Sequence, residues 1–293
     1  MVPAMNNIIL LAAGGDERSA GLCRILTEKL PCNAYSLALG DVPGAKILSS
    51  LSEMRFQPDL LVLPLPVSSD GVHLRTVFSE DKIRLKHLLD LCRRGTRVYC
   101  GKADDALREG CRERGLPLTD YLDDEAFTVK NAAATAEAAL ALAFDLRKKV
   151  FFGSTALILG GGRIAKNLIR LLTAYGVRVI CTARSPEQRT WASLMGAQAV
   201  PFGAIPDPGR IDMVFSTVPR TVFGEAELVL LRQDCLLIEL GSLPGGIDED
   251  AARNQGRHLV RASSLPGKTV PASASEWLAE LILEKEAAFL DKN

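Results

Sequence analysis

The sequence predicts an α/β protein built from two doubly wound domains, the first flavodoxin-like and the second of the Rossmann type. With 293 residues, the chain is longer than most single domains, so two domains are the natural division. Strand-like apolar runs alternate with helix-like segments from one end to the other, as parallel sheets require. In the second half, a glycine-rich turn follows one of these runs and opens a helix.

The first domain is predicted over residues 1–130. It begins with a buried strand at 7–13, and a Gly14-Gly15 turn then leads into an amphipathic helix at 16–30. The elements expected next are strands at 35–39, 60–65 and 97–100, a helical stretch between the first two of these, and helices at 81–94 and 104–114. Gly115 ends the last helix, as glycine commonly does.

An Ala-rich segment, residues 132–149, is strongly helical and ends in basic residues that suit the negative end of a helix dipole. We assign 131–150 as an interdomain helix, because it directly precedes a second α/β series. That series, predicted as a domain over 151–270, has strands at 156–159, 177–182, 213–217, 236–240 and 258–261, with a weaker one near Ala199. A last helix at about 275–290, within 271–293, is expected to pack back on the first domain.

Composition excludes several classes of function. The formal net charge is zero and no run of basic residues is interleaved with aromatics, which argues against nucleic-acid binding. No apolar run approaches the length of a membrane span, and no signal-peptide pattern opens the chain. The seven cysteines are scattered without a CxxC pair, as in a cytoplasmic protein with reduced thiols. We expect no metal site.

Gly160, Gly162 and Ala165 occupy the three key positions of a GxGxxA pattern, with Arg163 and Ile164 between the last two. The first small residue permits a tight turn. The second lets backbone N–H groups approach a pyrophosphate, and the third lets helix and strand pack closely. Because the turn also lies between a strand and a helix, with a second strand following, the sequence predicts a nicotinamide dinucleotide site.

The end of the following strand favours NADP(H) over NAD. A domain that prefers NAD usually places Asp or Glu there, about 20 residues beyond the first glycine, to hold the ribose 2′-hydroxyl. Here the strand ends in Thr182, Ala183, Arg184 and Ser185, without a carboxylate. Arg184 can pair with a 2′-phosphate, and the hydroxyls of Thr182 and Ser185 can donate hydrogen bonds to it.

Two further loops follow predicted strands at their carboxyl ends, where open α/β sheets bind ligands. One contains Thr217, Val218 and Pro219, and the other contains Gly241 and Ser242. We expect these residues to lie near the nicotinamide ribose.

No sequence pattern identifies the catalytic residues. The only histidines are His73, His87 and His258, and the chain has no Ser-His-Asp pattern. It also lacks a late histidine preceded by a suitably spaced glutamate. This argues against an ordinary 2-hydroxyacid dehydrogenase, which needs a histidine to move the hydroxyl proton.

Over nearly its whole length the chain resembles the dipicolinate synthase A subunits of spore-forming bacteria. The likeness depends on short stretches in a consistent order: Gly14 to Arg18, Leu63 to Pro66 with Asp70-Gly71, Asn131 to Glu137, the dinucleotide turn, Glu239 to Ser242 with Pro244-Gly245-Gly246 and Asp248, and Leu265 to Lys268 ahead of Pro271. Three positions depart from that pattern. From the family we expect an Asn-type residue where this chain has Ser216, and Ala near the position of Gly241. We also expect Pro where this chain has Ala134.

The resemblance implies a reaction. A hydroxytetrahydrodipicolinate, or the dihydro compound formed from it by loss of water, is oxidised to pyridine-2,6-dicarboxylate while hydride passes to NADP+. It also implies a second, flavoprotein-like B subunit and a location in the mother cell of a spore former, and it leaves a homo-oligomer open.

A planar dicarboxylate needs two cationic or N–H-rich anchors, and oxidation of its ring needs a proton acceptor. Lys268 is the first candidate for one carboxylate. Arg18, near the positive end of the first helix, is the candidate for the other. Ser242 and Thr135 are candidate hydrogen-bond donors, and Glu137 is a candidate base.

Two alternatives stay open. One is a different two-domain dehydrogenase of the hydroxyacid or adenosylhomocysteinase type, and the other is a non-catalytic NADP-binding subunit that regulates or scaffolds a partner. Hydride transfer by the purified chain distinguishes the second from an enzyme.

Overall fold

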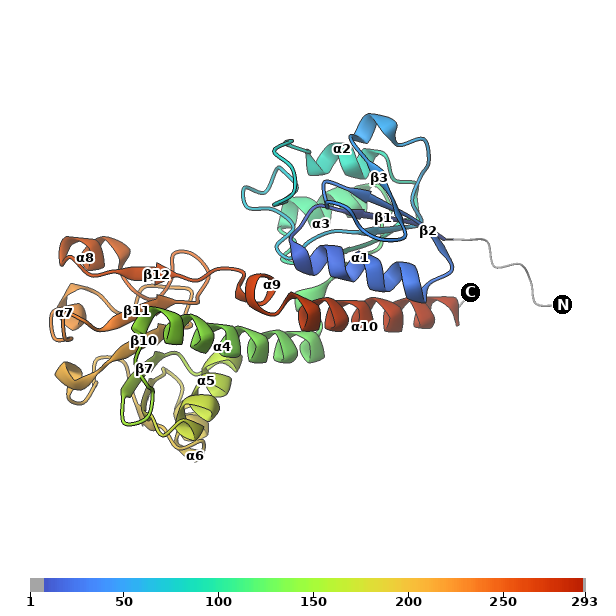
Figure 1. Cartoon of the computed structure of the whole chain (residues 1–293). Helices are drawn as coiled ribbons and strands as arrows, with labels where there is room; N and C mark the ends of the chain where they lie inside the picture. The colour runs from blue at the N-terminus through green and yellow to red at the C-terminus, as the bar shows by residue number, and fades with distance from the viewer. Residues whose placement is uncertain (1–7, 292–293) are drawn as a thin grey trace. The chain divides into compact units, whose positions relative to one another are not determined.

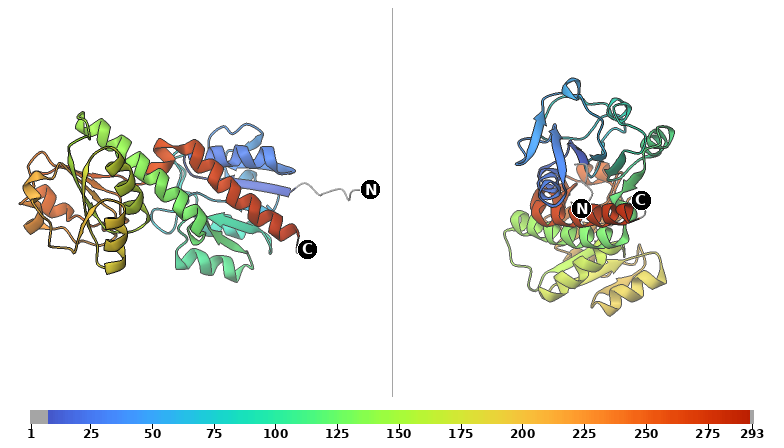
Figure 2. Two further views of the ribbon diagram at one scale, coloured as in Figure 1. Left: turned by 90° about the horizontal axis from the view of Figure 1, so that it is seen from below. Right: turned by 90° about the vertical axis from the view of Figure 1, so that its right-hand side faces the viewer.

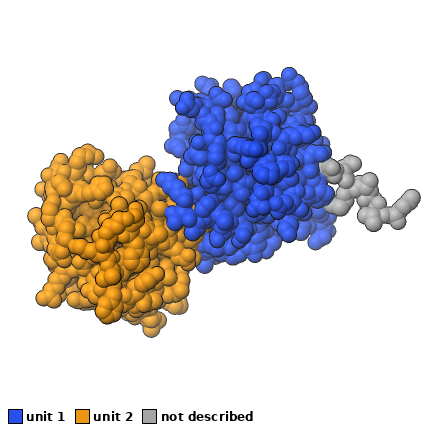
Figure 3. Space-filling model, in the orientation of Figure 1, with its two compact units in different colours: residues 1–130, 267–293 blue, residues 131–266 orange. Residues whose placement is uncertain are grey.

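The computed structural model describes residues 8–291, so residue 7 of the first predicted strand and the last two residues of the chain lie outside it. The chain divides into two compact units (Figure 3). Unit 1 comprises residues 1–130 and 267–293, and unit 2 comprises residues 131–266. No helix among residues 8–291 is long and apolar enough to cross a membrane.

Unit 1 contains a six-stranded parallel sheet with the strand order β3-β2-β1-β4-β5-β6 (Figure 1). The strands are β1 (Ile8–Ala13), β2 (Cys32–Leu37), β3 (Ala45–Leu48), β4 (Leu60–Val62), β5 (Arg97–Cys100) and β6 (Leu118–Asp120). The helices are α1 (Glu17–Lys29), α2 (Leu85–Asp90), α3 (Asp105–Glu113), the start of α4 (Glu125–Arg147) and α10 (Pro271–Leu290). Alternation along β1 separates two cores: Leu10 and Ala12 pack toward α1 and α10, and Leu11 and Ala13 toward α2 and α3.

The predicted flavodoxin-like order is present with one addition. Without β3, the strands of unit 1 run β2-β1-β4-β5-β6, which is the 2-1-3-4-5 order of flavodoxin. The prediction of a helical stretch between residues 39 and 60 was wrong, because the chain there forms β3 and a short 3-10 turn, Leu51–Glu53. Gly44, at φ +85°, turns the chain so that β3 pairs in parallel with β2.

The last helix, α10, runs beside α1 within unit 1 (Figures 1 and 2). Pro271 occupies its first turn, where a missing N–H costs nothing. The hydroxyl of Ser275 donates to the carbonyl of Arg18 at 2.8 Å. Further along α10, Glu286 accepts hydrogen bonds from Arg97 and Tyr99 of β5. Helix α10, from the end of the sequence, therefore completes the core of unit 1.

Unit 2 contains a second six-stranded parallel sheet with the order β12-β11-β10-β7-β8-β9, which is the Rossmann order. Its strands are β7 (Thr155–Leu159), β8 (Arg178–Thr182), β9 (Gln198–Val200), β10 (Met213–Ser216), β11 (Leu236–Glu239) and β12 (Leu259–Arg261). Its helices are the rest of α4, α5 (Arg163–Ala174), α6 (Pro186–Leu194), α7 (Glu225–Leu228) and α8 (Glu249–Asn254). The short α9 (Leu265–Thr269) crosses the boundary to unit 1.

Two helices differ in extent from the prediction. Helix α4 starts seven residues before 132, because the Asp124 side chain accepts from the backbone N–H of Phe127 at 2.9 Å and so caps an earlier turn. Helix α2 starts only at Leu85, because the residues before it are extended: Ile83 accepts from the N–H of Leu74 at 2.8 Å. Local pattern alone could not reveal this pairing. The two-domain doubly wound class itself is confirmed.

Candidate functional site

The glycine turn of unit 2 has the backbone geometry of a phosphate cradle. Gly160 lies at φ +106°, and a Cβ there would sit 2.5 Å from Oγ1 of Thr217. Gly162 is the N-cap residue of α5, and a Cβ on it would meet no atom within 4 Å. No side-chain hydrogen bond caps this end of α5, and the N-terminus of such a helix can bind an anion. The turn fits a pyrophosphate.

Close packing holds this turn against the sheet. Ala165 is fully buried in the core between α5 and the sheet. The thiol of Cys181 donates to the carbonyl of Gly160 at 3.3 Å, and burial raises the pKa of this thiol to about 11. The thiol therefore stays protonated at neutral pH and serves as a donor, while Arg163 and Ile164 begin the helix.

The end of β8 presents one exposed cation. Arg184 is exposed, and Ser185 caps α6 by accepting from the N–H of Gln188 at 3.3 Å. Arg189, which the sequence analysis did not single out, donates to the carbonyls of Ala183 and Arg184 at 2.8 and 2.6 Å and holds this segment in place. Thr182 is fully buried, and its hydroxyl has no partner within residues 8–291.

Hydrogen bonds to residues of the sheet fix the loops that follow β10 and β11. Thr217 donates to the carbonyl of Leu159 at 2.9 Å, and Val218 and Pro219 follow it. Glu239, which is 1% exposed, accepts from the N–H groups of Gly241, Gly246 and Ile247 at 2.7 to 3.0 Å. This buried carboxylate shapes the loop that displays the exposed Ser242. From the sequence, Glu239 was identified only as part of a stretch that resembles the family.

Unit 1 has a charged cluster at the carboxyl ends of β1 and β4. Asp16 caps α1 by accepting from the N–H of Arg18 at 3.2 Å. The same side chain pairs with the guanidinium groups of Arg18 and Arg75, each at 3.3 Å. Arg18 also donates to the carbonyl of Leu65, and its buried Nε has no partner in the described part of the chain. Burial lowers the pKa of Arg18, and the Asp16 charge opposes that shift.

This cluster occupies the switch point of its sheet. The strands β1 and β4 are neighbours, and the chain leaves them toward opposite edges, through β2 and β5. Open α/β sheets bind ligands outside the carboxyl ends of strands at such a point. In unit 2 the matching N-cap residue is Gly162, which has no side chain, whereas in unit 1 it is Asp16, with Arg18 in the first turn. The helix start of unit 2 can therefore admit a phosphate, whereas that of unit 1 already has the carboxylate of Asp16.

Lys268 belongs to unit 1 and is exposed. Its neighbour Gly267 lies against Asp16, because a Cβ on Gly267 would come within 2.7 Å of Oδ2 of Asp16. The segment that carries Lys268 therefore passes the charged cluster. Arg18 and Lys268, two candidates taken from different ends of the sequence, are brought to one region of unit 1.

The other three candidate substrate residues belong to unit 2. Thr135 is buried in α4, and its hydroxyl donates to the carbonyl of Asn131 at 2.7 Å. Glu137 and Ser242 are exposed. The hydroxyl of Thr135 keeps its acceptor lone pairs, and Glu137 is accessible to a proton donor.

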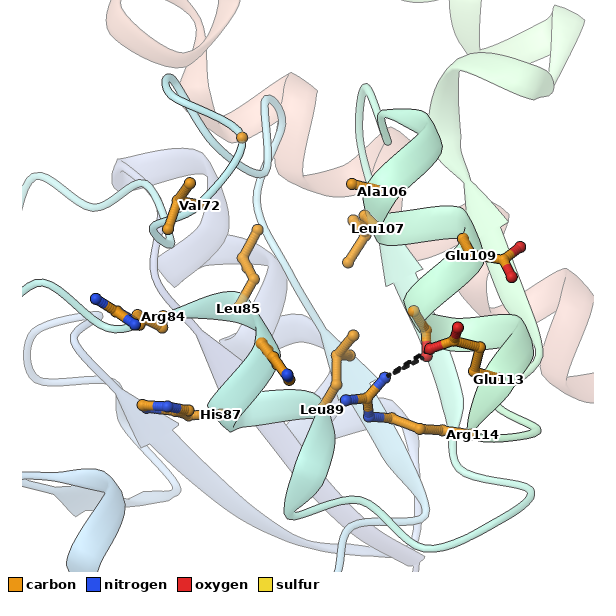
Figure 4. Close-up of a pocket in the computed structure, with 13 residues that line it drawn as sticks. Val72, Arg84, Leu85, His87, Leu89, Ala106, Leu107, Glu109, Glu113 and Arg114 are labelled. Carbon is orange, nitrogen blue, oxygen red and sulfur yellow. Dashed lines mark hydrogen bonds and ion pairs between the residues drawn. The ribbon is translucent and has the colours of Figure 1, made fainter.

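A separate groove of about 470 Å³ lies between α2 and α3 of unit 1 (Figure 4). Its apolar residues include Val72, Leu85, Leu89, Ala106 and Leu107, and charged side chains such as Arg84, Glu109 and Glu113 stand around them. It shares no residue with the Asp16 cluster or with the glycine turn. We therefore do not assign it to the catalytic site.

Comparison with known proteins agrees with these features. Residues 10–122 match the family model of the N-terminal domain of the dipicolinate synthase A subunit. Over 290 residues the chain is 26% identical to the dipicolinate synthase A subunit of Bacillus subtilis (strain 168), and the match covers 95% of each protein. By sequence, the chain is a relative of the dipicolinate synthase A subunit. The resemblance inferred from the sequence is thereby confirmed.

Solved structures show the same fold. The dipicolinate synthase A chain from Bacillus subtilis superposes with a TM-score of 0.84 at 24% identity, over 99% of both chains. An L-alanine dehydrogenase superposes with a TM-score of 0.62 at 14% identity, over 98% of this chain and 91% of the other. The chain thus has the two-domain fold of Rossmann dehydrogenases.

Proposed function

We propose that this relative of the dipicolinate synthase A subunit is an NADP-dependent oxidoreductase component that forms pyridine-2,6-dicarboxylate. One observation carries the proposal: the two sheets have switch points of complementary chemistry. In unit 2, α5 starts at a glycine N-cap without a side-chain cap, where a pyrophosphate can approach, and in unit 1 two guanidinium groups share the single carboxylate of Asp16. An enzyme that oxidises a small anion needs both kinds of site.

The reaction removes a hydride and a proton from the ring of a dihydrodipicolinate, which a hydroxytetrahydrodipicolinate yields by losing water. When bound, NADP+ supplies the hydride acceptor. Gly160, Gly162, Arg163 and Ile164 would hold its pyrophosphate at the start of α5. The loops carrying Thr217, Val218, Pro219, Gly241 and Ser242 would flank the nicotinamide ribose.

The substrate's carboxylates are assigned to Arg18 and Lys268, the two cationic candidates of unit 1. Ser242 and Thr135 are assigned as hydrogen-bonding residues, and Glu137 as the proton acceptor. A flavoprotein-like B subunit is the expected partner and the mother cell of a spore former the expected location, both from the family resemblance.

NADP rather than NAD is the proposed cofactor, because Arg184 is an exposed cation at the end of β8. Replacing Arg184 with alanine should raise the Kd for NADPH about tenfold or more, since a charge-assisted hydrogen bond to the 2′-phosphate is lost. The Kd for NADH should stay unchanged. Titration of the reduced cofactors by fluorescence measures both, with the exposed Arg170→Ala on α5 as a charge-matched control. A wild-type preference for NADH would overturn the assignment.

Product formation tests the reaction itself. The purified chain, alone and with its B subunit, is supplied with freshly generated substrate and NADP+, and the ultraviolet absorbance of the pyridine product is followed. We expect product together with an equal amount of NADPH. Cofactor binding without any product, with or without the B subunit, would instead support the alternative of a non-catalytic NADP-binding subunit.

A further inference from the structure

Arg75 belongs to unit 1's charged cluster through its pair with Asp16, although it is far from the other members in sequence. Its N–H donates to the carbonyl of Val67 at 2.9 Å, and its carbonyl accepts from the N–H of Gly15 at 2.8 Å. The backbone of Arg75 is therefore tied to the segments that follow β4 and β1. Its side chain reaches Asp16 from that position, 59 residues along the chain.

The loop before Arg75 is also well ordered by hydrogen bonds. Asp70 accepts from the N–H groups of Val72 and His73 at 2.9 and 2.8 Å, and its other oxygen lies 2.7 Å from Nδ1 of His73. The backbone N–H and the ring of His73 hold the pKa of Asp70 well below its usual range, so this carboxylate stays ionised. The loop can thus present Arg75 in a fixed direction.

The charges of the cluster do not balance. Two guanidinium groups share the single carboxylate of Asp16, and the side chains of Arg18, Arg75 and Asp16 are 3%, 17% and 8% exposed. Both ion pairs measure 3.3 Å, longer than the roughly 2.7–2.9 Å of strong charge-assisted bonds. An oxygen of Asp16 is also engaged in capping α1. One buried positive charge is left to be neutralised.

An unpartnered donor points to the same conclusion. The Nε of Arg18 is buried and has no hydrogen-bond partner among residues 8–291, although a buried donor is rarely left unpaired in a folded protein. The Nη2 of Arg18 already donates to Asp16 and to the carbonyl of Leu65, so its Nε is left for one charge-assisted hydrogen bond to a carboxylate oxygen. The charge excess and this unpaired donor both indicate a site for one more anion.

We infer that Arg75, together with Arg18, forms a carboxylate-binding subsite of unit 1 and that Arg75 sets its preference for dianionic ligands. The identity of the ligand, a small planar dicarboxylate, rests on the proposed function. The subsite itself rests on the charge excess and the unpaired Nε. Asp16 is a positioning residue in this subsite, because it pairs with both guanidinium groups.

Binding of the product tests this inference without catalysis. Calorimetry on the full chain, with divalent cations removed, measures the Kd for pyridine-2,6-dicarboxylate and for pyridine-2-carboxylate. Wild-type protein should bind the dicarboxylate more tightly. Arg75→Met should weaken dicarboxylate binding about 10- to 100-fold and reduce the preference over the monocarboxylate, since one charge-assisted contact is lost. Arg75→Lys should restore part of the preference, because lysine keeps the positive charge but lacks the paired N–H donors of a guanidinium.

The control is Arg84→Met, which removes an exposed arginine of the same unit that lies outside the cluster. It should bind both ligands as the wild type does, and all variants should keep the wild-type Kd for NADPH and the wild-type melting temperature. Unchanged dicarboxylate binding in Arg75→Met would overturn the inference, as would wild-type protein that binds neither ligand at millimolar concentration. Dicarboxylate binding that depends on Arg75, in a protein that forms no product, would uphold the subsite and refute the proposed function.

Discussion

Replacing Gly162 with valine should abolish dinucleotide binding while unit 2 stays folded. A Cβ on Gly162 meets no atom within 4 Å, and the backbone there is extended at φ −81° and ψ −168°, so the fold can accept a side chain. The open space is where a pyrophosphate would contact the first N–H groups of α5. Because at least two charge-assisted hydrogen bonds would be lost, the Kd for NADPH should rise more than about 100-fold.

The matched control for Gly162 is Gly224→Val. Gly224 is also an extended helix N-cap residue of unit 2, at the start of α7, so valine there carries the same capping cost of about 1 kcal/mol or less. Both variants should unfold at similar temperatures, and Gly224→Val alone should bind NADPH normally. If Gly162→Val bound NADPH as tightly as the wild type, α5 would not be the phosphate-binding helix.

Removing the carboxylate of Glu286 should strongly destabilise unit 1. Glu286 accepts from Nε of Arg97 at 2.8 Å and from the hydroxyl of Tyr99 at 2.9 Å, and its side chain is only 3% exposed. Glu286→Ala would leave the Arg97 charge, itself 16% exposed, without its partner. Breaking a buried pair in this way costs about 3–5 kcal/mol in the free energy of unfolding. Urea unfolding, followed by circular dichroism, measures the loss.

Glu284→Ala serves as the control, since Glu284 is exposed on the same helix and its removal should change stability by less than about 0.5 kcal/mol. The effect of Glu286 should extend to function, because α10 also holds the backbone of Arg18 through Ser275. A loss below about 1 kcal/mol in Glu286→Ala would mean that α10 is not fastened to β5 by this pair.

Much of the fold is predictable because its signals are local. Apolar runs of strand length, glycine at helix ends and the Ala-rich α4 each reflect the conformational preferences of a few neighbouring residues. The predictions were wrong where distant segments decided the outcome. Residues 45–48 form an edge strand because they pair with β2, and residues 83 and 84 are extended because they pair with Leu74 and His73.

The site divides in the same way. By itself, the sequence determined the glycine turn, the lack of an acidic residue at the end of β8, where Arg184 stands, and the family to which the chain is related. The first two are set by a few adjacent residues, whose spacing determines the backbone geometry directly, and the third by short stretches in a consistent order. Only the tertiary structure decided that Arg75 joins Asp16 and Arg18, that Glu239 shapes the Ser242 loop, and that Glu286 fastens α10 to β5. These contacts exist because the crossovers of the two sheets bring distant parts of the chain to the same strand ends or helix faces, and local sequence patterns carry no record of such crossings.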